Sequence, residues 1–123
     1  MLQVSLKNTL DIVDHLRLGE ALQSLRSENV LIVGSGSTTH RPGISDDNRR
    51  RFMDWFHDTL TNNAYSPEKR KQLLINSQQE PIFYAGHQRI EHFLPSLVAC
   101  AGAHYRPGIV LYEDSWMSHV KFD

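Results

Sequence analysis

The chain has 123 residues, of which 40% are hydrophobic, and its formal net charge is −1. This length predicts one domain with a core of ordinary size. The nearly balanced charge gives no general attraction to nucleic acid or to an anionic membrane, so neither is expected as a partner.

The single cysteine, Cys100, cannot form an internal disulfide, so the composition does not indicate an oxidising compartment. Because Cys100 lies in an apolar run with small residues, we expect a buried and unreactive thiol. No run approaches the ~20 apolar residues of a membrane helix, and the N-terminal residues lack the pattern of a signal peptide. We therefore expect a cytoplasmic protein.

The N-terminal part of the chain predicts a strand, a helix and a second strand. Residues 2–6 alternate between apolar and polar side chains, as a half-buried strand does. Asp11 or Asp14 can cap a helix that continues through Leu25, and residues 30–33 are typical of a buried strand. Strand, helix and strand over about 30 residues is the pattern of a parallel βαβ unit.

The rest of the chain predicts further helices and strands. Ser45 is suited to cap a helix that runs to about Thr61, and Ser66 followed by Pro67 is suited to start another. The apolar patterns then predict a helix over residues 93–103, a strand over 109–112 and a last strand over 119–122. The expected fold is one α/β domain over residues 1–123, with a central, mostly parallel sheet flanked by helices.

The second predicted strand ends in a loop of small residues and a histidine. Gly34 and Gly36 allow a sharp turn and the close approach of another group. Ligand sites in open α/β sheets lie at polar loops that follow buried strands. We therefore expect this loop to deliver His40 to a pocket, and the alternative is a loop histidine that bonds to backbone.

A second cluster places two histidines and a carboxylate close together in sequence, as a metal site requires. His87 and His92 are not spaced as two ligands on one helix face, so the pattern favours one ligand from each of two elements. Glu91 could ligate in place of His92 or orient an imidazole. For His15, on a predicted helix, we expect a surface position. The remaining histidines have positions typical of surface or structural residues: His57, His104 and His119.

The glycine loop does not match other loop motifs. It lacks the third glycine of the dinucleotide fingerprint and the Gly-Lys-Ser/Thr ending of a P-loop. It also does not match the Gly-x-Ser-x-Gly motif, because no glycine lies two residues after Ser37. A hydrolase that uses Ser35 or Ser37 with His40 is therefore kept only as a third alternative.

These motifs together resemble the class III extradiol ring-cleavage dioxygenases, in the branch that contains DOPA 4,5-dioxygenase. The whole chain is similar to the C-terminal half of the catalytic domain of that family. The glycine-loop histidine and the Glu-His-Phe-Leu-Pro run at residues 91–95 are together its most specific part. The segments that carry the resemblance are residues 2–6, 15–22, 30–40 and 87–102.

The resemblance implies a non-haem metal enzyme that binds Fe(II) or Zn(II), one per complete site, and inserts both atoms of O₂ into a catechol such as DOPA. By position, His40 would be the acid/base residue or an additional metal ligand. His92 would be a metal ligand, with Glu91 as the alternative. His87 would line the substrate pocket.

The family also carries two further metal-binding histidines in an N-terminal half that would precede Leu2. We therefore expect an incomplete half of a larger domain, with an exposed sheet edge and apolar surface. Such a surface favours association with the missing half or with a second copy. Activity of the chain alone is left open, and the alternative function is a non-catalytic α/β remnant that dimerises or binds a partner.

Overall fold

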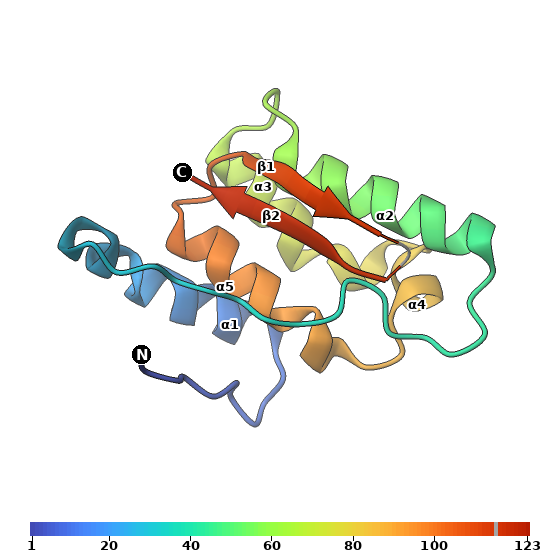
Figure 1. Ribbon diagram of the computed structural model, residues 1–123, viewed down its shortest axis with the longest axis horizontal. Helices are drawn as coiled ribbons and strands as arrows, with labels where there is room; N and C mark the ends of the chain where they lie inside the picture. The colour runs from blue at the N-terminus through green and yellow to red at the C-terminus, as the bar shows by residue number, and fades with distance from the viewer. Residues whose placement is uncertain (115) are drawn as a thin grey trace.

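The computed structural model describes residues 1–114 and 116–123 (Figure 1). Among these residues, no helix is long and apolar enough to cross a bilayer. With η for a 3-10 helix, the elements follow in this order: α1 (Ile12–Ala21), η1 (Gln23–Glu28), α2 (Asp46–Thr61), α3 (Pro67–Ile75), η2 (Ser77–Gln79), α4 (Phe83–Gly86), η3 (Ile90–His92), α5 (Leu94–Gly102), β1 (Gly108–Glu113) and β2 (Ser118–Phe122).

Side-chain caps start three of the helices. Asp11, Ser45 and Ser66 each accept a hydrogen bond from the backbone N–H three residues further along, at the starts of α1, α2 and α3. Each cap satisfies one of the free N–H groups of the first helical turn. The predicted starts of these helices are confirmed. The first helix ends at Ala21, earlier than expected, and the chain continues as the 3-10 helix η1.

The core lies between the helices. The α1 helix packs along α5, and α2 packs against α3, α4 and β1. At Gly19 a Cβ atom would lie only 2.4 Å from the backbone oxygen of Val98, so a glycine is required for the close approach of α1 and α5. Cys100 on α5 is fully buried, and burial raises the pKa of its thiol to about 12, as expected for an unreactive cysteine.

The two strands form an antiparallel hairpin that lies alongside α2 in Figure 1. Gly108 is opposite Phe122, and the register shifts once within β1, as at a β-bulge. The predicted strands at residues 109–112 and 119–122 are confirmed, and the chain has a mixed helix and strand fold.

The predicted central parallel sheet is not formed by the described residues, which contain only the antiparallel pair. Residues 2–6 and 30–33 are not paired as strands in this part of the chain. Leu31 and Val33 expose 83% and 74% of their surface. A strand needs a neighbour to satisfy its backbone groups, and a sheet needs several strands to be stable. Without such neighbours, the apolar pattern of residues 30–33 gives exposed, unpaired chain.

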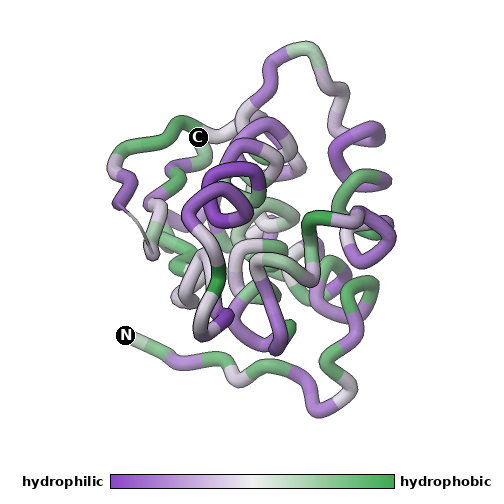
Figure 2. The backbone as a smooth tube through the Cα atoms, turned by 90° about the vertical axis from the view of Figure 1, so that its right-hand side faces the viewer, coloured by the Kyte–Doolittle hydropathy of each residue, from purple (hydrophilic) through white to green (hydrophobic). Residues whose placement is uncertain are grey.

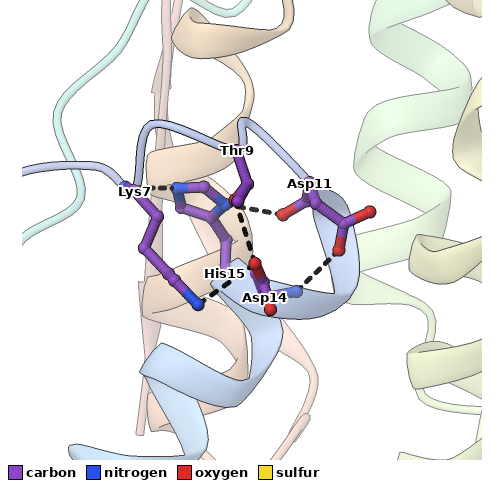
Figure 3. A network of polar contacts seen from close by, with 5 residues as sticks. All are labelled: Lys7, Thr9, Asp11, Asp14 and His15. Carbon is purple, nitrogen blue, oxygen red and sulfur yellow. Dashed lines mark hydrogen bonds and ion pairs between the residues drawn. The ribbon is translucent and has the colours of Figure 1, made fainter.

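His15 is buried, so its predicted surface position is wrong. Its Nε2 accepts a hydrogen bond from the backbone N–H of Lys7 at 3.1 Å, and its Nδ1 donates to the carbonyl of Asp11 at 2.6 Å (Figure 3). The ammonium of Lys7 also lies 3.1 Å from the carboxylate of Asp14. The histidine thereby ties the segment before α1 to that helix, a contact that helical periodicity alone does not reveal.

Candidate active site

The glycine loop lies directly against the start of α5. A Cβ atom at Gly34 would lie 2.1 Å from the carbonyl oxygen of Pro95, and one at Gly36 would lie 2.2 Å from that of His92. Both distances are far below any tolerable contact. The two glycines are therefore required for close approach of the loop to the segment that carries His92.

This close approach brings His40 and His92 together. Their rings stack with centroids 4.0 Å apart and an interplanar angle of 17°. His40 follows the glycine loop, and His92 is the last residue of η3. The structure thus combines the two sequence clusters, with one histidine from each of two separate segments.

The β hairpin holds the glycine loop from one side. The backbone N–H of Ser118 donates to Thr38 Oγ1 at 2.8 Å, and the N–H of Thr39 donates to the carbonyl of Trp116 at 3.4 Å. Ser118 Oγ is also 2.7 Å from His57 Nε2, which connects the hairpin to α2. Sequence reasoning missed these residues, because partners so far apart along the chain leave no local pattern.

His87 holds the same loop from the other side. Its side chain is 1% exposed, and its Nε2 donates to the carbonyl of Thr38 at 2.5 Å. The rings of Phe52, Phe83 and Phe93 surround it. Burial lowers the pKa of His87 below its ordinary value, because the charged ring would lose its water. Its role in lining the substrate pocket stays a prediction.

The lowered pKa of His87 predicts a pH-dependent stability. Below the ordinary value of 6.5, the unfolded chain binds a proton that the folded His87 ring does not. The free energy of unfolding should therefore fall as the pH drops from 6.5 toward the lower pKa of the folded state. In the His87→Gln variant this part of the slope should be absent. Urea unfolding of both proteins above and below pH 6.5 measures how the free energy of unfolding changes with pH. Equal changes in the two proteins would contradict the lowered pKa of His87.

The imidazole pair fits part of a metal site. The Nδ1 atom of His40 is buried and has no hydrogen-bond partner among the described residues. Imidazole nitrogen is a preferred ligand of both iron and zinc. Among residues 1–114 and 116–123, however, no group of three or more His, Cys, Asp or Glu side chains could hold a metal ion. A complete site would need further ligands in addition to these histidines.

A groove opens beside His92, while His40 and His87 are not among the residues that line it. Its volume is about 590 Å³, which lies within the range of small-molecule sites. It runs between residues 30–38 and the β hairpin, and His92 lines it together with Phe56 and Phe93. An aromatic molecule in this groove could therefore lie against an apolar wall next to His92.

Comparison with known proteins defines the class. A family model described as the catalytic LigB subunit of aromatic ring-opening dioxygenase matches residues 1–118. The chain belongs to this family of ring-opening dioxygenases, whose extradiol members are metal-dependent. The resemblance to the class III extradiol enzymes is thereby confirmed.

Individual relatives make the relationship more specific. A 4,5-DOPA dioxygenase extradiol of Beta vulgaris is 34% identical over 121 residues, which cover 93% of this chain and 43% of the relative. The protein of the same name from Mirabilis jalapa is 28% identical over 98% of this chain and 46% of its own length. A 4,5-DOPA dioxygenase extradiol-like protein of Schizosaccharomyces pombe is 34% identical over 80% of this chain and 35% of its own length. The chain spans less than half the length of these relatives, and no solved structure matches it significantly.

Proposed function

We propose that this chain forms part of the active site of an extradiol dioxygenase that opens the ring of a catechol with O₂. The observation that carries the proposal is the stacking of His40 on His92 at 4.0 Å, beside a groove of small-molecule size. The family match and the names of the relatives support a DOPA-like substrate.

In this proposal His40 is the acid/base residue. Its buried Nδ1 has no hydrogen-bond partner among the described residues, so no contact in this part of the chain competes for a proton at this atom, as an acid/base role requires. An imidazole suits the task because its ordinary pKa lies close to neutral pH. The same nitrogen could instead serve as an additional metal ligand, and the variants described below separate the two roles.

His92 is the proposed metal ligand. Glu91 is the weaker candidate, because its carboxylate lies 3.7 Å from the guanidinium of Arg89 and forms an ion pair there. Fe(II) and Zn(II) both accept imidazole ligands, and the further ligands would come from outside this histidine pair. When bound, such an ion supplies a Lewis-acidic centre with open positions for a catecholate and O₂.

The larger fold follows from the same proposal. Residues 30–33 would pair with further strands in the complete catalytic domain and would form part of a mostly parallel sheet there. The exposed side chains of Leu31 and Val33 would then be covered. A pairing of this kind would also leave the glycine loop at the end of a strand, where ligand sites of α/β proteins lie.

A ring-opening assay tests the proposed function. The chain is loaded with Fe(II) without oxygen, mixed with L-DOPA and then exposed to isotopically labelled O₂. A product that contains both labelled atoms would support the proposed function and would show that this chain assembles a working site with further ligands. In the His40→Ala variant its formation should slow by about 10²–10⁴-fold, as for the loss of a general acid/base. If His40 is instead a ligand, the variant should also lose bound iron.

The assay needs a control for the general loss of a histidine. His104 is exposed and has a left-handed backbone, with φ at 56°. Because asparagine tolerates this conformation, the His104→Asn variant should fold normally and retain full activity. Equal rates in the His40→Ala and His104→Asn variants would contradict the acid/base role. If the iron-loaded chain forms no ring-opened product, this chain is not active by itself.

One observation favours a second function, association through an exposed apolar surface. Figure 2 shows hydrophobic residues in the peripheral N-terminal segment, where Leu2 and Val4 expose 96% and 60% of their surface. Leu31 and Val33 are similarly exposed. Exposed apolar residues in an unpaired segment are typical of an interaction site. A concentration-dependent dimer in sedimentation experiments, abolished by the Leu31→Ser and Val33→Ser double variant, would support this function.

A further inference from the structure

The position of His40 raises a structural problem. The residues between Gly34 and Thr39 belong to no helix or strand, so the local backbone does not fix the His40 ring. An irregular loop gains defined geometry only when other contacts offset the entropy that it loses. The stacking of His40 on His92 therefore depends on whatever holds this loop.

His87 provides two kinds of contact to the loop. Its ring Nε2 donates to the carbonyl of Thr38, two residues before His40. Its backbone forms a parallel bridge with the backbone of His40. On either side of that bridge, the N–H of His40 donates to the carbonyl of Gly86 at 2.9 Å, and the N–H of Gln88 donates to the carbonyl of His40 at 3.4 Å.

The surroundings of His87 make it a rigid support. Its ring centroid lies 5.2 Å from that of Phe52, 5.9 Å from that of Phe83 and 5.7 Å from that of Phe93. The preceding Gly86 packs so closely on Phe52 that a Cβ atom would lie 2.4 Å from the aromatic ring. The His87 ring therefore contacts a neighbour of each stacked histidine: Thr38, two residues before His40, and Phe93, which directly follows His92.

We propose that His87 is a positioning residue, whose ring holds the Thr38–His40 segment so that His40 stacks on His92. The inference rests on the proposed dioxygenase site for its functional meaning. In this proposal His87 acts by positioning His40 and does not contact the substrate itself. The 1% exposure of the His87 side chain supports this, because a ring buried among three phenylalanines offers little surface to a ligand.

Two replacements of His87 and one control separate positioning from general packing. The amide of glutamine can place an N–H donor near the position of the histidine Nε2, so His87→Gln should keep the bond to Thr38. Leucine fills space but cannot donate, so His87→Leu should lose it. Phe83→Leu, which loosens the same aromatic surroundings and leaves the donor in place, is the control for weakened packing.

Imidazole NMR of the full chain is the measurement. Stacked rings shift the carbon-bound protons of one another upfield, and we expect this shift for His40 and His92 in the unmodified chain. It should persist in His87→Gln and Phe83→Leu and disappear in His87→Leu, where the His40 amide should also exchange faster with solvent. Retention of the upfield shift in His87→Leu would overturn the proposal, as would its equal loss in Phe83→Leu.

A Zn(II) titration of the same variants tests the link to the proposed function. If the stacked pair presents His92 to a metal, His87→Leu should weaken zinc affinity by about 10–100-fold, the usual effect of losing an outer support. His87→Gln should restore most of it. Failure of the unmodified chain to bind zinc would count against the proposed function, while the NMR comparison would still decide whether His87 positions His40.

Discussion

Replacing Arg70 with methionine is expected to lower the free energy of unfolding by about 2–4 kcal/mol. The Arg70 side chain is fully buried on α3. Its guanidinium donates to the carbonyl of Thr59 at 2.9 Å and to that of Tyr105 at 2.8 Å. It also donates to the carbonyl of Asn62 at the end of α2. Methionine cannot donate, so these carbonyls would lose their partner inside the protein.

Urea unfolding of matched variants measures this effect. Arg51 on α2 has a side chain that is 65% exposed, so Arg51→Met should change stability by less than about 0.5 kcal/mol. Arg70→Lys should fall between the two, because lysine keeps a charge but cannot reach several carbonyls from one rigid fork. An Arg70→Met variant as stable as Arg51→Met would show that the buried guanidinium is not a structural link between α2 and α3.

Replacing Gly36 with valine is expected to separate His40 from His92. Because a Cβ atom at Gly36 would lie 2.2 Å from the carbonyl oxygen of His92, the loop must move away from η3. We expect a loss of about 1–3 kcal/mol in the free energy of unfolding, as for an overpacked core. The upfield NMR shifts of both histidine rings should disappear, together with any metal binding that depends on their arrangement.

Ser35 offers the matched control on the same loop. It is exposed and lies next to Gly36, so Ser35→Ala should leave stability and both ring shifts unchanged. If Gly36→Val kept the stacked histidines, the close approach of the loop to His92 would not be what assembles the site. The Ser35→Ala variant also tests the hydrolase alternative, because unchanged labelling by a serine-reactive probe would exclude Ser35 as a nucleophile.

The local structure that the sequence predicts correctly is the part that depends on local chemistry. Caps at Ser45 and Ser66 satisfy the first N–H groups of their own helices, so a short pattern contains the information. The apolar patterns also predict the two strands of the C-terminal hairpin. The described residues do not show the predicted parallel sheet, since residues 30–33 have an apolar strand pattern but no paired neighbours there.

In the candidate site, too, the sequence predicts what depends on local residues and does not predict what depends on distant contacts. The glycine loop and the Glu-His-Phe-Leu-Pro run identified His40 and His92 as candidates, but their juxtaposition rested on a family resemblance. The requirement for Gly36 is set by a carbonyl far away in sequence, and so is the burial of His87. For His15, the hydrogen-bond partner Lys7 lies before the helix, so the helical pattern alone does not reveal that the ring is buried.

Iron binding by the purified chain under anaerobic conditions tests the central claim most directly. The chain, the His92→Ala variant and the His104→Asn control would be titrated with Fe(II) and the bound metal counted. We predict about one bound Fe(II) per chain in the unmodified protein and in the control. In His92→Ala the affinity for Fe(II) should fall by about 10–100-fold or more. Equal binding by His92→Ala and the unmodified chain, or no binding by either, would contradict the assignment of His92 as a metal ligand in this chain.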